Sequence, residues 1–241
     1  MLSIIKYILL GLSIAVCMLV GAIIATFLRP FHPIHIYYMA KIWGPIAGTI
    51  LGVKFKKLNF DRLNSERSCV YVMNHQSNMD IVVAAQIKLN NTVTLGKKQI
   101  FYFPIFGQWY WLSGNILIKR EKRSAIIRSM LRVTKSITRK NRSILIMPEG
   151  TRSKGKGLGR FKAGAFKTAI NAGVPIVPII ISDWFENVNL NKIKSGEIKI
   201  KILPEFSTTG LGASDAGELS QKVHQTMSQE LEKINLSVEK V

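Results

Sequence analysis

Residues 174–181 read VPIVPIII, a run in which every side chain is apolar. A second run, SILIM at residues 143–147, is almost as continuous. Apolar stretches of this length, without alternating polar residues, are typical of β-strands that helices cover on both faces. The two runs therefore predict the central strands of an α/β sheet.

Short β-rich runs and helical runs alternate around these two strands. We expect further strands at Cys69–Met73, Thr92–Leu95, Asn115–Ile118 and Glu197–Leu203, and helices at Ile81–Ile87, Lys122–Lys140, Gly164–Asn171 and Ser214–Leu236. Strands separated by helices are typical of parallel pairing. Residues 54–241 are therefore predicted to form an α/β domain with a mixed, largely parallel sheet flanked by helices.

The N-terminal part of the chain has a different composition. No charged residue occurs from Tyr7 to Leu28, and a helix of this length matches the hydrocarbon core of a bilayer. A signal peptide is the competing interpretation, but its apolar region would be shorter, and no small-residue cleavage site precedes Arg29. A second apolar stretch, Ile34–Val53, contains Lys41 and Gly44-Pro45, which favours a kinked or interfacial helix. Residues 1–53 are therefore predicted to be a helical membrane anchor.

The chain is strongly basic, with 34 Lys and Arg against 14 Asp and Glu, a net charge of +20. Such an excess favours anionic partners: a bilayer surface, an acidic carrier protein, a phosphate ester or nucleic acid. The basic residues are dispersed over several elements, and no known nucleic-acid-binding motif is present, so no nucleic-acid partner is expected. The basic excess beyond the anchor predicts a globular part on the cytoplasmic side of the inner membrane. Cys17 and Cys69 lack the spacing of a zinc site, and no metal is expected.

The run Asn74-His75-Gln76-Ser77-Asn78-Met79-Asp80 lies between a predicted strand and a predicted helix, where α/β proteins place reacting groups. An imidazole at His75 can accept a proton near neutral pH, and Asp80 can fix its tautomer through the other ring nitrogen. Five positions apart on one helix, the two side chains would point away from each other. They can meet only if His75 lies in the turn and Asp80 in the first helical turn. The alternative is a loop histidine and an acid that serves the helix dipole.

A second polar run, Pro148-Glu149-Gly150-Thr151-Arg152-Ser153, follows the predicted strand at 143–147. Gly150 allows the backbone to approach a ligand closely, and the planar guanidinium of Arg152 matches phosphate oxygens. Residues 154–160 are basic and glycine-rich, but the G-x-x-x-x-G-K-[ST] pattern is absent, so nucleotide hydrolysis is not expected. The run predicts a phosphate site, with a solvated basic turn as the alternative. Arg120, at the end of the predicted strand 115–118, is a weaker candidate.

Together these runs resemble the glycerolipid acyltransferase family, in particular its bacterial 1-acyl-sn-glycerol-3-phosphate acyltransferases. NHQSNMD at 74–80, GNILIKR at 114–120, PEGTRS at 148–153 and VPIVPI at 174–179 are similar to its four sequence blocks, in the same order. The resemblance implies that His75 is the catalytic base and that Asp80 orients it. It also implies that the acceptor is bound by Lys97, Arg120, Glu149, Gly150, Thr151 and Arg152.

The activity implied by this resemblance is acyl transfer from acyl-CoA or an acyl carrier protein to lysophosphatidic acid. The acyl group would go to the sn-2 hydroxyl of 1-acyl-sn-glycerol 3-phosphate and give phosphatidic acid, with no cofactor. Direct attack is expected because a thiol, with a pKa of about 8.5, is a good leaving group. The alternatives are acylation of glycerol 3-phosphate or of another lysophospholipid, and an inactive scaffold. An alternative from another class is a non-enzymatic, membrane-tethered nucleic-acid binder.

Overall fold

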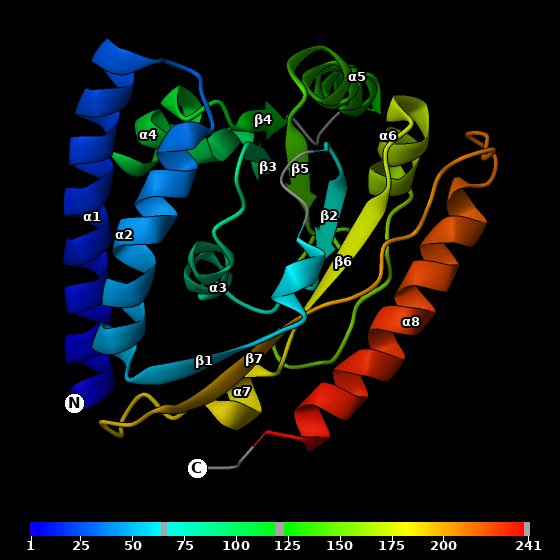
Figure 1. Ribbon diagram of the computed structural model, residues 1–241. Coiled ribbons are helices and arrows are strands. Elements are labelled where there is room, and N and C mark those ends of the chain that lie inside the picture. Colours follow the sequence, from blue (N-terminus) through cyan, green and yellow to red (C-terminus); the bar gives the residue numbers. More distant parts are fainter. Residues whose placement is uncertain (64–66, 119–122, 239–241) are drawn as a thin grey trace.

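The computed structural model describes residues 1–63, 67–118 and 123–238, with only the backbone described for residues 123–126. Within these residues the chain forms a seven-stranded sheet with helices on both faces and a pair of long helices along one side (Figure 1). The strands are β1 (Val53–Leu58), β2 (Val70–Met73), β3 (Thr92–Lys97), β4 (Ile116–Ile118), β5 (Ser143–Ile146), β6 (Ile176–Ile181) and β7 (Gly196–Ile202). The helices are α1 (Leu2–Leu28), α2 (Ile34–Leu51), α3 (Asp80–Ile87), α4 (Phe106–Leu112), α5 (Arg123–Lys140), α6 (Gly164–Ala172), α7 (Trp184–Asn187) and α8 (Ala216–Leu236), with 3₁₀ helices η1 (Phe60–Arg62) and η2 (Lys98–Tyr102).

The sheet is mixed and mainly parallel, which confirms the predicted fold class. Its strand order is β1-β7-β6-β2-β5-β3-β4. The strands from β6 to β4 pair in parallel, whereas β7 pairs antiparallel with β6 and parallel with β1. The carboxyl ends of β2, β3, β4, β5 and β6 therefore meet at one edge of the sheet, here called the carboxyl edge.

The apolar run at 174–181 contributes β6, in which every residue is buried. A proline inside a strand cannot donate to the hydrogen-bond ladder. The Leu203 N–H donates to the Pro178 carbonyl at 2.9 Å, but Pro178 has no N–H with which to return the bond. The ladder between β6 and β7 consequently ends at the pair Ile179 and Ile202. Pro178 thus lies where the ladder to β7 ends, while the pairing of β6 with β2 continues through it.

Alternate residues of the central strands face two apolar layers. In β2, Tyr71 and Met73 pack in a layer with α2 and α3, whereas Val70 and Val72 pack in a layer with α5, α6 and α8. All four side chains are buried. Burial of a large apolar side chain contributes about 1.5–3 kcal/mol, so apolar residues are favoured at all four positions of β2. The first polar residue after the strand is Asn74. The first polar side chains therefore appear at the carboxyl edge.

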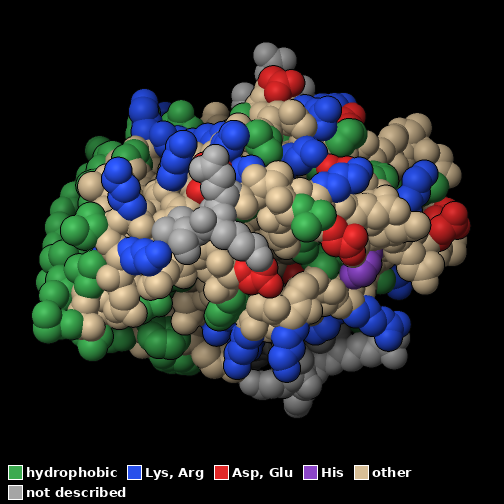
Figure 2. All heavy atoms as spheres, turned by 90° about the horizontal axis from the view of Figure 1, so that it is seen from below, with side chains coloured by type: hydrophobic (Ala, Val, Ile, Leu, Met, Phe, Trp, Pro, Cys, Tyr) green, Lys and Arg blue, Asp and Glu red, His purple; other side chains and the backbone are tan. Residues whose placement is uncertain are grey.

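Helix α1 lies lengthwise against α2 and α4 (Figure 1). Its buried face carries Lys6, Leu10, Met18 and Ala25, and most of the remaining surface is exposed and apolar. Figure 2 shows hydrophobic side chains gathered along the side of the molecule where α1 lies, with Lys and Arg distributed over the rest of that view. Among the helices that the structure describes, α1 alone is long and apolar enough to cross a membrane.

Helix α2 covers most of the second apolar stretch and forms a hairpin with α1 (Figure 1). It packs against α3 and places Trp43, Ala47 and Leu51 in the same apolar layer as β2. One residue, Gly52 with φ of +65°, then connects it to β1. The N-terminal hairpin therefore shares its core with the sheet.

Several elements were not predicted from the sequence: the short helix α7, the two 3₁₀ helices, β1 and α4. β1 is short and lysine-rich, as edge strands often are, and it pairs with β7 far along the chain, so no local pattern reveals it. α4 has the sequence FGQWYWL, in which the aromatic residues favour a strand as much as a helix.

Candidate active site

The turn between β2 and α3 brings His75 and Asp80 together. Asp80 is the first residue of α3, and His75 lies in the preceding turn, which is the arrangement that the sequence required for the pair to meet. His75 Nδ1 lies 2.6 Å from Asp80 Oδ2. An ionised carboxylate can only accept, so the ring donates through Nδ1 and leaves Nε2 as the acceptor. No hydrogen bond from another described residue is recorded at Nε2.

The Asp80 carboxylate is held firmly in this position. Its side chain is 2% exposed, whereas that of His75 is 21% exposed. Oδ2 also accepts the backbone N–H groups of Gln76, at 2.8 Å, and Ser77, at 3.2 Å. The carboxylate thus serves both the turn and the imidazole, and it is more deeply buried than the ring that it orients.

Two amide side chains, which were not predicted to have a role, fix the His75 turn to the end of β6 and to the residues that follow it. Asn74 exchanges two hydrogen bonds with the backbone of Ile181, at 2.8 and 3.0 Å. Gln76 donates to the carbonyls of Ile181 and Ser182 and accepts the N–H of Trp184. The signal was present in the sequence, because both amides flank the histidine directly after an apolar strand.

The loop after β5 lies against the His75 turn. Glu149 accepts the His75 N–H through Oε1 at 2.7 Å and the Gly159 N–H through Oε2 at 2.8 Å. In the other direction, the N–H groups of Ser153 and Lys154 donate to the carbonyls of His75 and Gln76, at 2.8 and 3.2 Å. The second polar run is therefore bound to the first along its backbone.

Glu149 is 5% exposed, and burial is the largest influence on its pKa. Loss of solvent raises the pKa of this carboxyl above its ordinary value, and the hydrogen bonds from the His75 and Gly159 N–H groups act in the opposite direction. Its two oxygens are both occupied by backbone donors. Glu149 therefore ties the loop after β5 to the His75 turn, and its expected contact with the acceptor stays a prediction.

The residues after Glu149 are presented to solvent. Gly150 has φ of +72°, and a Cβ there would lie 2.8 Å from Lys162 Nζ, so glycine suits both the backbone and the space. Thr151 and Arg152 are exposed. A cavity of about 950 Å³ beside this loop is lined by Glu149, Thr151 and the cations of Arg160 and Lys162, among others; His75 is not among its lining residues.

The remaining predicted residues have different outcomes. Lys97 is the exposed last residue of β3 and so lies at the same carboxyl edge as the His75 turn, separated from β2 by β5. Arg120 lies outside the described residues. Within the described part of the chain, no cluster of three or more His, Cys, Asp or Glu side chains could hold a metal ion.

An imidazole oriented by a buried carboxylate, as in His75 and Asp80, is typical of general-base catalysis. The loop bonded to the His75 turn carries the exposed guanidinium of Arg152. Comparison with known proteins gives the class. A family model described as Acyltransferase matches residues 54–182. The chain therefore belongs to the acyltransferase family, and it is an acyltransferase enzyme.

Individual relatives agree with this assignment. The chain is 36% identical over 226 residues to the 1-acyl-sn-glycerol-3-phosphate acyltransferase of Escherichia coli strain K12 and to that of Salmonella typhimurium, covering 94% of this chain and 91% of each relative. The fold is shared with the crystal structure of the 1-acyl-sn-glycerophosphate acyltransferase PlsC from Thermotoga maritima. That match has a TM-score of 0.79 at 19% identity and covers 99% of this chain and 97% of the other.

Proposed function

We propose that this enzyme transfers a fatty acyl group from a thioester to the sn-2 hydroxyl of 1-acyl-sn-glycerol 3-phosphate, giving phosphatidic acid. The observation that carries the chemistry is the 2.6 Å contact between His75 Nδ1 and Asp80 Oδ2, which leaves Nε2 as an acceptor. The acceptor lipid is inferred from the names of the bacterial relatives that match nearly the whole chain.

In the proposed reaction, His75 Nε2 takes the proton of the acceptor hydroxyl as its oxygen attacks the thioester carbonyl. The new C–O bond forms, the C–S bond breaks, and the proton passes from the imidazolium to the departing thiolate. Asp80 stabilises the imidazolium between these two transfers. General-base catalysis of this kind contributes about 10²–10⁴ in rate.

No covalent enzyme intermediate is included. Ser77 is the hydroxyl nearest in sequence to the base, and its Oγ accepts the N–H of Met79 at 3.0 Å within the turn. Its hydroxyl therefore has a structural role in shaping the start of α3, which supports direct transfer.

The acceptor phosphate is assigned to the loop after β5. Arg152 and Thr151 are exposed there, and Ser153 bonds directly to the His75 backbone, so a phosphate held by this loop would lie close to the base. Lys97, at the carboxyl edge, is proposed to add positive charge there. Arg120 is proposed as a further cation for the acceptor. A guanidinium–phosphate pair is the strong, bidentate form of this recognition.

The anchor is proposed to be the hairpin of residues 1–53, in the inner membrane, with the sheet domain of residues 54–241 on the cytoplasmic side. The exposed apolar surface of α1 supports membrane association. A long-chain lysolipid remains mainly in the bilayer, because each buried CH₂ contributes about 0.8 kcal/mol. An enzyme held at the surface can therefore take the head group without extracting the chain.

A side-by-side assay tests this assignment. Purified enzyme in phospholipid nanodiscs is supplied with one acyl thioester and either 1-acyl-sn-glycerol 3-phosphate, glycerol 3-phosphate or a lysophospholipid with a larger head group. We expect phosphatidic acid from the first acceptor and at most slow transfer to the others. Preferential acylation of glycerol 3-phosphate would replace the proposal with its nearest alternative.

A further inference from the structure

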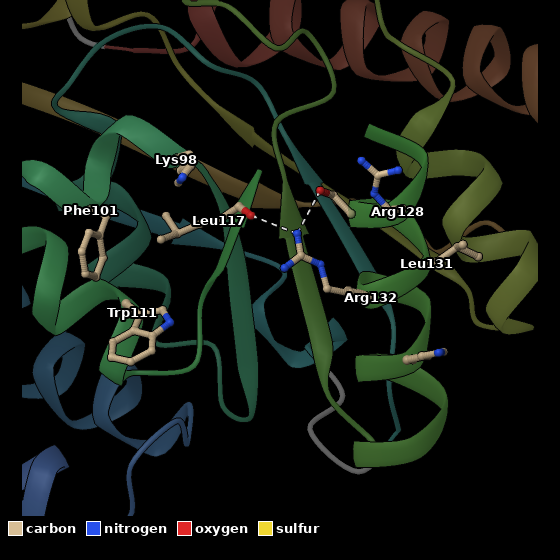
Figure 3. Close-up of a pocket in the computed structure, with 9 residues that line it drawn as sticks. Lys98, Phe101, Trp111, Leu117, Arg128, Leu131 and Arg132 are labelled. Carbon is tan, nitrogen blue, oxygen red and sulfur yellow. Dashed lines mark hydrogen bonds between the residues drawn. The ribbon is translucent and has the colours of Figure 1, made fainter. Parts of the chain in front are cut away.

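A groove separate from the loop after β5 lies at the β4 edge of the sheet, between α5 on one side and η2 with α4 on the other (Figure 3). It has a volume of about 810 Å³ and is lined by four cations, Lys98, Arg128, Arg132 and Lys135. α5 supplies three of them at spacings of four and three residues, so they share one face of the helix. Among the described residues, no carboxylate lines the groove, and no ion pair between them involves these cations.

The opposite wall of this groove is aromatic. Phe101 and Trp111 meet edge to face, with ring centroids 5.9 Å apart, and Leu117 lies beside them (Figure 3). Trp111 is 44% exposed, whereas the other three tryptophans, Trp43, Trp109 and Trp184, are at most 5% exposed. An aromatic ring left accessible beside arginines is the combination that binds a nucleobase and its phosphates.

One of the four cations, Arg132, is held in place by hydrogen bonds within the protein. The Arg132 guanidinium donates to the Leu117 carbonyl at 3.4 Å and to Ser129 Oγ at 3.1 Å, linking α5 to β4 across the groove (Figure 3). A guanidinium has five N–H donors in a planar fork, so these contacts leave donors for a ligand. Less side-chain freedom is then lost when an anion binds.

One end of the groove lies at the carboxyl edge of the sheet. Lys98 directly follows Lys97, the last residue of β3. β3 and β2 run in the same direction, since each pairs in parallel with β5, so the end of β3 and the His75 turn lie along one edge. A long flexible ligand anchored in the groove can therefore extend along this edge towards His75.

We propose that this groove binds the phosphorylated nucleotide of an acyl coenzyme A, with adenine against Trp111 and the phosphates on the four cations. The pantetheine arm would then carry the thioester along the carboxyl edge to His75. This proposal rests on the proposed function, because it locates the donor of that reaction. Coenzyme A has a purine, a diphosphate and a phosphate monoester, which match an aromatic wall facing several cations.

The shape of the groove favours a small molecule over a carrier protein or a bilayer lipid. Small-molecule sites have volumes of about 300–1,000 Å³, whereas stable protein docking uses about 800 Å² of surface on each partner. The exposed apolar helix α1 packs against α2 and α4, and α5 lies away from it across β4 (Figure 1). A single lipid phosphate would also leave most of the cations unpaired.

Tryptophan fluorescence tests the proposal without turnover. In the His75→Ala enzyme in nanodiscs of neutral phospholipid, we expect coenzyme A to quench the emission of Trp111 with saturation. 3′-Dephospho-coenzyme A should bind several-fold more weakly, and added salt should weaken both. The Trp111→Phe variant should show no quenching. Absence of saturable quenching at millimolar coenzyme A would overturn the proposal, and wild-type acyl transfer, measured separately, would still report on the proposed function.

A charge-matched pair of variants completes the test. Arg128→Gln with Lys135→Gln removes two cations that make no recorded contact with Leu117, so Arg132 keeps its link; Lys167→Gln with Lys222→Gln removes two exposed lysines elsewhere. The groove variant should raise the Kd for coenzyme A and the KM for acyl-CoA about tenfold, and the control should leave both unchanged. An equal effect of both variants, or a KM effect confined to an acyl carrier protein donor, would contradict the nucleotide assignment.

Discussion

The Glu149 carboxylate accepts the backbone N–H of His75 at 2.7 Å, so the loop after β5 holds the His75 turn after β2. Its second oxygen accepts the Gly159 N–H at 2.8 Å and thereby includes the following glycine-rich segment. A single buried acid thus connects the proposed base with the segment that carries Arg152. Changes at Glu149 should consequently alter both the stability and the geometry of the site.

Replacement of Glu149 by Gln should change how stability depends on pH. Because burial raises the pKa of Glu149, its contribution to stability is fully present below the unfolded pKa, about 4.3, and is lost as pH rises through the folded pKa. Glu149→Gln lacks this titration. The free energy of unfolding of the wild type minus that of the variant should therefore fall as the pH rises above the unfolded pKa of about 4.3.

Denaturant unfolding in detergent micelles at several pH values measures this difference. Glu232→Gln, an exposed change on α8, is the control and should show no such trend. A difference that rises with pH would show that the hydrogen bonds to Glu149 outweigh its loss of solvent.

Asp80→Asn should reduce kcat while leaving the KM of either substrate nearly unchanged. The amide retains the shape and can accept the turn N–H groups, but it has no negative charge with which to stabilise the imidazolium. We expect a loss of about 10² or more in kcat, measured under saturating substrates. Asp61→Asn, an exposed change, serves as the control; a loss below about fivefold in Asp80→Asn would mean that the carboxylate only shapes the turn.

Arg152→Ala should raise the KM for the lysolipid acceptor. A hydrogen bond to a charged group contributes about 1.5–3 kcal/mol, so the rise should be roughly tenfold to a hundredfold. The thermal unfolding temperature should stay within about 1 °C of the wild type, because the exposed side chain supports no packing. Lys156→Ala, in the same loop, tests whether any lost cation has this effect, and an unchanged acceptor KM would remove Arg152 from the phosphate site.

Lys6→Met should loosen α1 from the sheet domain. The buried Lys6 ammonium donates to the carbonyls of Leu51 and Lys192 and to Ser195 Oγ, at 2.7–2.8 Å. Removal takes one donor from each of these oxygens, although the Lys192 carbonyl keeps the Ser195 hydroxyl. A buried group left unsatisfied costs about 1–3 kcal/mol. We expect faster proteolysis near residues 192–195 and a lower unfolding temperature, neither of which should occur in the exposed Lys41→Met. Unaltered proteolysis would show that the apolar face of α1 suffices for docking.

The sequence was most informative where structure depends on neighbouring residues. The buried strands β5 and β6 and the amphipathic helices α5 and α8 follow from local patterns, and their ends were predicted to within about two residues. β1 was missed because its stability comes from pairing with β7, and a six-residue strand with three lysines has no apolar pattern of its own.

The same distinction applies to the site. The contact between His75 and Asp80 could be predicted, because one turn joins the two residues. The support from Glu149 could not, since it depends on β2 and β5 being adjacent in the sheet, which no local pattern encodes. The roles of Asn74 and Gln76 likewise depend on β6 lying next to β2.

The proposed reaction requires the His75 imidazole to remove the proton of the acceptor hydroxyl. The most direct measurement is the single-turnover rate of His75→Ala with 1-acyl-sn-glycerol 3-phosphate and an acyl thioester, alongside its unfolding temperature and a His32→Gln control. We expect a loss of at least about 10² in rate with the fold intact. A folded His75→Ala enzyme that retains a tenth of the wild-type rate would contradict it.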